Sequence, residues 1–397
     1  MAKSILFISH NASRTGAPIQ LLYFLTWLKK NTDITFQILL DDGGPLEPDF
    51  AACAPVSILN KTIPVTNYRL AKAFNVLGVQ RIAKTIHRTL LRRKLIHANI
   101  GLICSNTGTN AEALEFLAGL QCPTITFVHE SDFVMRYYIG IKIFEKVKKY
   151  THHYTACSEA VRKSLVEHHG IPRDTIDLVY GFIPASSYAT RDCHRLRARL
   201  CGQLNIPVES FIVCAAGDID WRKGSDLFIQ LARTVHTRQP NIPVYFIWIG
   251  GTTEGCYFKQ LYHDIEAYDL ERFVHFIEQV PNPVDYFAAS DIITVVSREE
   301  PFSLVALEAA SVGKPIVCFS TIGAAEAFVD DTCGRLAPYM DIEAMAEHVM
   351  HLLHDVDLRQ QLGRHAAEKV RHQYDTEVGA PKLLSIIKKF LTQEIAE

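Results

Sequence analysis

The chain has 397 residues, of which 48% are hydrophobic, and carries a formal net charge of −2 at pH 7. Because one hydrophobic core usually stops growing below this length, two domains are expected. No apolar stretch approaches the length of a membrane-spanning helix, and the apolar run near the N-terminus is too short for a signal peptide core, so neither an integral membrane protein nor a secreted one is expected. The ten cysteines include no Cys-x-x-Cys pair, which predicts free thiols in the reducing cytoplasm, without disulfides or a zinc site.

Charge is distributed unevenly along the chain. Residues 1–200 carry 25 Lys and Arg against 15 Asp and Glu, which leaves 16 against 28 for residues 201–397. Much of the positive charge lies between Arg69 and Lys94, where basic and apolar residues form an amphipathic pattern. Such a segment can contact an anionic acceptor or an anionic membrane surface, which for a cytoplasmic protein is the inner face of the membrane. A helix face exposed to solvent is the alternative. The near-neutral net charge and the lack of a nucleic-acid-binding motif argue against a nucleic-acid partner.

In the N-terminal half, short apolar runs alternate with helical patterns. Residues 4–9 predict a buried strand, 10–17 a loop, and 18–30 an amphipathic helix with proline in its first turn. Gly16 allows close backbone approach to a ligand at this helix start, although a tight turn alone would also explain it. Further strands are expected at 34–40, 102–106, 124–128, 153–156 and 177–180, with helices at 110–120 and 158–169.

The pattern restarts after residue 208. Residues 184–208 are polar and rich in arginine, with a proline near each end, and predict a linker. Alternating strands and helices indicate parallel sheets covered on both faces. The prediction is therefore an α/β fold with two Rossmann-like, doubly wound parallel-sheet domains, 1–190 and 205–375, facing across a cleft, and a C-terminal helix at 376–397 that packs back on the first domain. Strands of the second domain are expected at 211–216, 244–249, 273–277, 291–296 and 315–319.

Residues 297–317, SREEPFSLVALEAASVGKPIV, place two carboxylates around a helix start. The loop after the strand at 291–296 contains Glu300, and helical periodicity runs from Ser303 through Glu308 to Gly313. A helix start offers unpaired N–H groups and a positive dipole end to an anion, while carboxylates accept hydrogen bonds from hydroxyls. The combination favours a nucleotide or sugar phosphate, and a surface helix with two solvated glutamates is the alternative.

A second motif, GDIDWRKG at 217–224, follows the strand at 211–216. Arg222 and Lys223 are adjacent cations at the start of a helix, which suits a diphosphate whose charge grows as it leaves. A charged loop that caps a helix is the alternative. Because ligands of doubly wound sheets bind beyond the carboxyl ends of the strands, these cations, Glu300, Gly16 and His129 (after the strand at 124–128) are expected at one cleft.

With these residues together, the chain resembles the retaining glycosyltransferases of family 4, which have the GT-B fold. The resemblance covers nearly the whole chain and rests mainly on three motifs: EPFSLVALE at 300–308 followed by GKP at 313–315, RKG at 222–224, and GAAE at 323–326. It implies an acceptor-side first domain and a nucleotide-sugar donor domain after it.

The resemblance also implies a role for each site residue. Glu300 would bind hydroxyls of the donor sugar, Glu308 the ribose, and Arg222 and Lys223 the diphosphate. The backbone at Gly16 and Gly217 and the N–H groups of Phe302, Ser303 and Leu304 would contact the donor. His129 would hydrogen-bond the transferred sugar, a role favoured over that of a base; with Glu300, Arg222 and Lys223 it makes up the expected catalytic set.

Three positions depart from the family pattern. Asp218 stands where an arginine usually follows the glycine, which puts the two-cation arrangement in question unless Arg222 supplies the charge. Glu278 replaces a common glycine near the expected base site, and Ser303 replaces another glycine.

The predicted activity is transfer of a hexosyl residue, with retention, from a UDP- or GDP-sugar to a glycan or lipid-linked acceptor, in polysaccharide or glycolipid biosynthesis. No metal and no separate cofactor are expected, because the cations take the metal's role. The alternatives are a nucleotide-sugar epimerase of similar build and a catalytically silent sugar-binding or scaffold protein.

Overall fold

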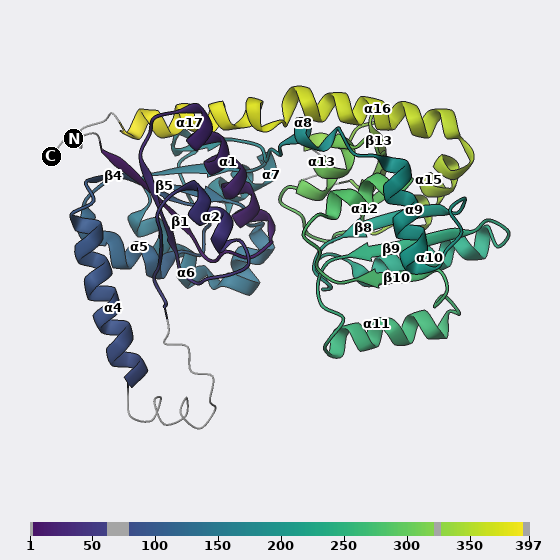
Figure 1. Ribbon diagram of the computed structural model, residues 1–397, viewed down its shortest axis with the longest axis horizontal. Coiled ribbons are helices and arrows are strands. Elements are labelled where there is room, and N and C mark those ends of the chain that lie inside the picture. The colour runs from purple at the N-terminus through teal and green to yellow at the C-terminus, as the bar shows by residue number, and fades with distance from the viewer. Residues whose placement is uncertain (1–2, 62–78, 321–326, 392–397) are drawn as a thin grey trace. The chain divides into compact units, whose positions relative to one another are not determined.

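The computed structural model of the protein describes residues 3–61, 79–320 and 327–391 (Figure 1). The chain divides into two compact units. The first comprises Met1–Val179 together with Ala380–Glu397, and the second comprises Tyr180–Gly379. Two stretches used above lie outside the described residues: the N-terminal part of the basic segment, up to residue 78, and the GAAE element at 323–326.

The first unit is built on a seven-stranded sheet whose described pairings are all parallel, in the order β3-β2-β1-β4-β5-β6-β7. All six residues of β1 are buried, as expected of a central strand that helices cover on both faces. The strands are β1 (Ser4–Ser9), β2 (Phe36–Leu40), β3 (Val56–Ile58), β4 (Ile100–Ser105), β5 (Thr124–Val128), β6 (His153–Ala156) and β7 (Ile176–Leu178). The main helices are α1 (Gly16–Asn31), α2 (Glu47–Cys53), α4 (Val79–Ile96), α5 (Ala111–Leu117), α6 (Ile141–Tyr150) and α7 (Glu159–Glu167). A π-helix spans Val134–Gly140, and short 3-10 helices span Ala118–Leu120 and Arg173–Thr175.

The second unit has a six-stranded parallel sheet in the order β10-β9-β8-β11-β12-β13. Its strands are β8 (Phe211–Ala216), β9 (Val244–Ile249), β10 (Val274–Ile277), β11 (Ile292–Val295), β12 (Ile316–Phe319) and β13 (Gly334–Ala337). Its helices are α8 (Ala185–Tyr188), α9 (Cys193–Leu204), α10 (Ser225–Arg238), α11 (Cys256–Ala267), α12 (Pro283–Ala289), α13 (Leu304–Ser311), α15 (Ile342–His354), α16 (Val356–Gln373) and the start of α17 (Thr376–Leu391).

Alternating side chains of the second sheet feed two hydrophobic clusters. Val213 and Ala215 of β8 belong to a cluster with residues of α10 and α15, whereas Ile212 and Cys214 belong to a cluster with residues of α9, α12 and α13. This period of two places one core on each face of the sheet. The predicted pair of doubly wound parallel-sheet domains is thereby confirmed as a fold class.

The expected linker at 184–208 is wrong. This stretch forms α8 and α9 within the second unit, and Leu200 and Cys201 of α9 are buried in the core. Arg197 does not face solvent: it donates to the Ala289 carbonyl at 2.9 Å and to Asp291 at 3.1 Å. Arg191 and Arg197, which bind backbone carbonyls and carboxylates, therefore account for part of the polar composition of the stretch.

Helix α17 belongs to both units, since it begins in the second and residues from Ala380 onward are part of the first. It is the yellow helix labelled in Figure 1. Within the first unit, its buried side chains include Ile386 and Ile387, and its Phe390 ring lies 4.9 Å from the ring of His153.

Candidate functional site

Two loops of the second unit lie side by side because they follow neighbouring strands. Strands β8 and β11 are adjacent, and the loop after each leaves from its carboxyl end. The Arg298 N–H donates to the Arg222 carbonyl at 2.8 Å, and the Arg222 guanidinium donates to the Glu299 carbonyl at 3.3 Å. The RKG and EPFS motifs therefore form one surface at the edge of the sheet where ligands of such folds bind.

At the centre of this surface, Lys223 and Glu300 form an ion pair. The lysine Nζ lies 2.5 Å from Glu300 Oε2, and the Ser297 hydroxyl donates to the same oxygen at 3.1 Å. The side chains are 16% and 6% exposed, respectively, so both groups are held largely away from water. Such a pair can direct an ammonium to a phosphate and a carboxylate to hydroxyls.

Helix α13 starts directly after this loop. Its N-cap is Ser303, whose hydroxyl accepts from the Ala306 N–H at 3.2 Å, which is the geometry that the family's common glycine could not supply. The first N–H groups of an α-helix have no carbonyl acceptor within the helix, so the start of α13 suits an anion. Glu308 lies on α13 and is buried, and the side chain of Phe302 packs near Tyr180 and Tyr374.

The glycines of the RKG loop have steric reasons for their identity. Gly224 has a φ of +76°, and a Cβ there would lie 2.2 Å from the Val296 carbonyl oxygen. Gly217 has a φ of +154°, and a Cβ would lie 3.1 Å from the Lys223 side chain. Both glycines therefore let the RKG loop pack closely, Gly224 against the end of β11 and Gly217 against Lys223.

Three residues that hold the two loops in place, Arg298, Asp226 and Trp221, were not predicted from the sequence as site residues. Arg298 is 8% exposed and donates to both carboxylate oxygens of Asp226, at 2.8 and 2.6 Å, and to the Trp221 carbonyl at 2.7 Å. The hydrogen bonds to Asp226 raise the pKa of Arg298. These partners are 72 and 77 residues away in sequence, and no local pattern signals them.

The departures from the family pattern have separate outcomes. Asp218 is exposed, while Asp220 two residues later accepts from the Lys223 N–H at 2.6 Å. Arg222 lies within 4.0 Å of Asp220.

Glu278 accepts hydrogen bonds from the Thr253 N–H and hydroxyl at 3.1 and 2.7 Å, and these bonds lower the pKa of Glu278. Glu278 thus fixes the loop after β9.

In the first unit, His129 is linked to the start of α1 through one asparagine. The Asn106 side-chain amide donates to the Ala17 carbonyl at 2.7 Å, so its Oδ1 faces His129 Nε2 at 3.2 Å. The imidazole must then donate through Nε2, which leaves Nδ1 as an acceptor. Burial, with His10 nearby, lowers the pKa of His129 to about 4. A neutral imidazole that accepts through Nδ1 can receive a hydrogen bond from a hydroxyl.

Gly16 is the first residue of α1. It has no positive φ, and a Cβ there would meet nothing within 4 Å. The tight-turn explanation therefore does not apply, and the space beside the helix start is open among the described residues.

Glu130 organises the loops after β4 and β5. Its carboxylate accepts from the Gly108 and His129 N–H groups, each at 3.1 Å, and from the Thr107 hydroxyl. Burial raises the pKa of Glu130 against the opposing effect of these bonds. The residue supports the backbone of His129.

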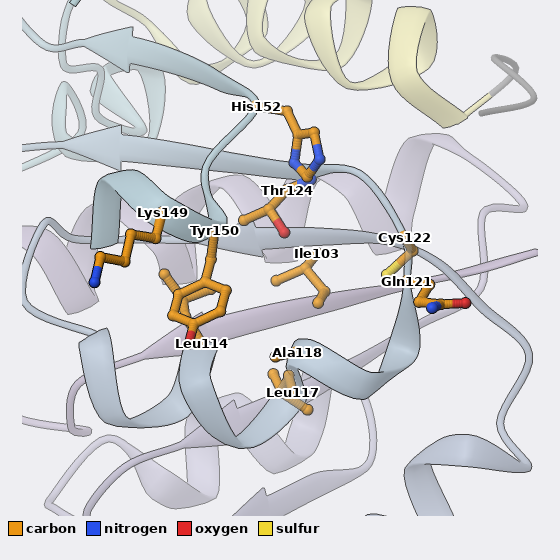
Figure 2. Close-up of a pocket in the computed structure, with 10 residues that line it drawn as sticks. All are labelled: Ile103, Leu114, Leu117, Ala118, Gln121, Cys122, Thr124, Lys149, Tyr150 and His152. Carbon is orange, nitrogen blue, oxygen red and sulfur yellow. The ribbon is translucent and has the colours of Figure 1, made fainter. Parts of the chain in front are cut away.

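A cavity of about 280 Å³ lies elsewhere in the first unit (Figure 2). Its walls include Thr124, the first residue of β5, and His152, which immediately precedes β6. It is therefore at the amino ends of these strands, away from the carboxyl edge that carries His129. Figure 2 shows an apolar floor that includes Leu114 and Leu117.

Within the parts of the chain that the structure describes, no group of three His, Cys, Asp or Glu side chains could hold a metal ion. No helix in the same ranges is long and apolar enough to cross a membrane.

Two family models match the chain: "Glycosyl transferases group 1" over residues 197–369 and "Glycosyltransferase Family 4" over residues 40–187. The fold is that of GT-B glycosyltransferases. HepE of Anabaena, solved with UDP and glucose, superposes with a TM-score of 0.80 at 19% identity, over 97% of this chain and 99% of that one. The chain belongs to the family 4 glycosyltransferases.

Two curated relatives are similar to the chain over about half its length. D-inositol 3-phosphate glycosyltransferase of Corynebacterium aurimucosum is 27% identical over 238 residues, 59% of this chain and 56% of that protein. N-acetyl-alpha-D-glucosaminyl L-malate synthase of Bacillus anthracis is 26% identical over 221 residues, 55% of each. The chain thus spans only about half the length of the curated relatives it matches.

Proposed function

We propose that the protein transfers a hexosyl residue, with retention and without a bound metal, from a nucleotide diphosphate sugar to a hydroxyl of a glycan or lipid-linked acceptor, in polysaccharide or glycolipid biosynthesis. The observation that carries the proposal is the buried Lys223–Glu300 pair beside the start of α13. Solved structures of similar fold hold UDP and UDP-glucose, which supports a nucleotide-sugar donor.

In this proposal, the second unit holds the donor. Arg222, Lys223 and the N–H groups of Phe302, Ser303 and Leu304 neutralise the diphosphate, while Glu300 and Glu308 accept hydrogen bonds from the sugar and the ribose. The bond from the sugar to the phosphate oxygen breaks, and the acceptor oxygen bonds on the same face. The acceptor proton passes to the leaving phosphate oxygen. The cations stabilise the charge on that phosphate, which is the main contribution asked of the protein.

The first unit supplies Gly16 and His129 in the same proposal. Through Nδ1, His129 accepts a hydrogen bond from a hydroxyl of the transferred sugar. The backbone at Gly16 leaves room for the donor. A neutral imidazole with a pKa near 4 is poorly suited to act as a base near pH 7, which favours the hydrogen-bonding role.

Incubation with UDP-, GDP- and ADP-sugars tests the proposal, with nucleotide release measured with and without acceptors. Glu300→Ala is expected to abolish transfer while donor binding falls only modestly. Lys148 is unsuitable as an exposed control, because it donates to Glu145 and to the His169 carbonyl. Glu266→Ala, at an exposed position of α11, is the matched control.

Each outcome of this assay has a defined meaning. Equal losses of transfer activity in Glu300→Ala and Glu266→Ala would show that Glu300 has no specific role in transfer. An epimerised nucleotide sugar would indicate an epimerase. Nucleotide-sugar binding without turnover of any donor, after the acceptors have been screened, would indicate a silent sugar-binding or scaffold protein.

We also propose that α4 contacts an anionic membrane, which would place the protein at the inner face of that membrane. Ile82, Ile86 and Leu90 are 60%, 55% and 58% exposed and recur every four residues, so they form one stripe. Arg92 and Arg93 lie on the same helix, which matches an anionic surface. The other basic residues are engaged in part, since Arg88 pairs with Glu112 and Lys94 donates to Ser57 at 3.2 Å.

Sedimentation with vesicles tests this contact. Replacing Arg92, Arg93 and Lys94 by glutamine should reduce binding to anionic vesicles, and replacing Ile82 and Leu90 by serine should reduce it further. Neutral phosphatidylcholine vesicles are the control. Unchanged sedimentation of both variants would leave α4 as a solvated helix.

A further inference from the structure

One buried asparagine joins the two parts of the first unit that the proposed donor site uses. Asn106 follows β4 directly and is 1% exposed. Strand β4 lies between β1 and β5, so Asn106 has the loop that leads to Gly16 on one side and His129 on the other. Its own N–H donates to the Ile8 carbonyl at 2.9 Å, which fixes its backbone to β1.

The two ends of the Asn106 amide face different partners. The amide nitrogen donates to the Ala17 carbonyl at 2.7 Å, and Oδ1 lies 3.2 Å from His129 Nε2. A carbonyl can only accept, so turning the amide round would set Oδ1 against the Ala17 carbonyl, acceptor to acceptor. The orientation of Asn106 therefore decides which nitrogen of His129 carries the proton.

The other ring nitrogen of His129 is available to a ligand. His129 is half-buried, and no described residue donates to its Nδ1. This atom is not among the fully buried side-chain atoms of the described residues that lack a partner, so it reaches the surface. With the proton held at Nε2 by Asn106, Nδ1 presents a lone pair there.

The groups around His129 do not supply a positive charge to change this. Burial, with His10 nearby, lowers the pKa of His129, and burial lowers the pKa of His10 against the effect of Asp42. Arg14, the cation of the loop 10–17, shifts the pKa of neither histidine. Glu130 is an acceptor, and its carboxylate already takes the His129 backbone N–H at 3.1 Å. At neutral pH the imidazole is therefore an uncharged acceptor at Nδ1.

We propose that Asn106 is a positioning residue that fixes the direction of the hydrogen bond at His129, so that the site takes a sugar whose hydroxyl donates there and disfavours a group that can only accept. The inference deepens the proposed transferase function and rests on it for the placement of the sugar at His129. Through Ala17, the same asparagine holds His129 in register with the start of α1.

The tautomer can be measured without any substrate. Long-range proton–nitrogen correlation NMR on the full chain, with isotope-labelled histidine, distinguishes a protonated ring nitrogen from a bare one. The signal that disappears in His129→Phe assigns the residue among the 17 histidines. We expect a protonated Nε2 and a bare Nδ1 near pH 7, and a protonated Nδ1 in the wild type overturns the inference.

Two substitutions of Asn106 test its control over the ring. Asn106→Asp places a carboxylate opposite Nε2, which favours the imidazolium, so Nδ1 should gain a proton. Asn106→Leu removes the acceptor at similar volume, so both tautomers should appear, and it serves as the second variant if the aspartate variant melts below the assay temperature. Asn31→Asp, at an exposed position of α1, is the matched control and should leave the His129 signal unchanged. Wild-type signals in the Asn106 variants overturn the inference.

Fluorinated donors test the direction of the bond to the sugar. The probes are UDP-glucose and its monofluoro analogues, because fluorine in place of a hydroxyl can accept weakly but cannot donate. In the wild type, fluorine at one ring position should weaken binding at least about tenfold. In Asn106→Asp the loss at that position should shrink several-fold, since Nδ1 then donates, while losses at the other positions stay as in the wild type. Losses that are the same in the wild type and the Asn106 variants at every position overturn the inference.

Binding is measured rather than turnover, so the two proposals fail separately. If the analogue losses depend on Asn106 but no donor is turned over, the transferase proposal fails and the role of Asn106 in binding stands. If donors are turned over but the losses do not depend on Asn106, the transferase proposal stands and this inference falls.

Discussion

Arg298 offers the sharpest test of how the two donor-side loops are held together. Lysine at this position keeps the positive charge but can replace about one of the three hydrogen bonds that the guanidinium makes to Asp226 and Trp221. Two lost bonds that involve a charged group, at about 1.5 kcal/mol each, predict a loss of about 3 kcal/mol in unfolding free energy. In a unit of this size the melting temperature should fall by about 6 to 12 °C.

The same substitution at an exposed site provides the control. Arg238 is 39% exposed and pairs with Glu343 and Glu347 on the surface of the same unit, so Arg238→Lys should cost less than about 1 kcal/mol. Burial, rather than the number of ion pairs, decides the difference between the two sites.

Tryptophan fluorescence in a Trp27→Phe background reports on the second unit alone, because the remaining indoles, Trp221 and Trp248, both lie there. Arg298→Lys should also raise the KM for the donor, since Arg298 fixes the loop that carries Lys223. Equal stability of Arg298→Lys and Arg238→Lys would refute this reasoning.

Two further predictions follow from backbone geometry and from burial. Gly224→Ala should lower the unfolding free energy by at least about 2 kcal/mol and abolish donor binding, because its Cβ would lie 2.2 Å from the Val296 carbonyl oxygen. Gly202→Ala is the control: it lies inside α9 with nothing within 4 Å of its Cβ, and it should raise the unfolding free energy by about 0.5–1 kcal/mol. Urea unfolding measures both variants, and similar effects would contradict the steric argument. Burial and the nearby charges of Glu112 and Asp42 raise the pKa of Asp41 to about 7, so the folded chain holds a proton that the unfolded chain releases near about pH 4. The unfolding free energy of the wild type should therefore fall relative to that of Asp41→Asn as pH rises from about 4 to about 7. Urea unfolding across this range measures it, and parallel pH profiles of the two proteins would contradict it.

The fold was predictable where strands are buried on both faces. Such strands are continuous apolar runs, as at Phe211–Ala216, and their ends were placed within one or two residues. The edge strands β3 and β13 were missed because they are only three and four residues long and partly exposed, so they leave no apolar run. The arginines of 184–208 suggested solvent because composition does not show which carbonyls they bind.

The site was predictable residue by residue but not as a set of contacts. Arg222, Lys223, Glu300 and Glu308 follow from strand ends and helix starts. The Lys223–Glu300 pair spans 77 residues and depends on β8 and β11 being neighbours, which is a property of sheet order rather than of spacing.

Helix α17 has a consequence for synthesis of the chain. The second unit is a continuous stretch that is complete once residue 379 has been made, whereas the first unit includes residues from Ala380 onward. The buried Ile386 and Ile387 and the Phe390–His153 contact belong to the stretch that begins at Ala380. The unit translated first can therefore finish folding only after the second has left the ribosome, and until then it exposes the surface that α17 will cover, where chaperones can bind.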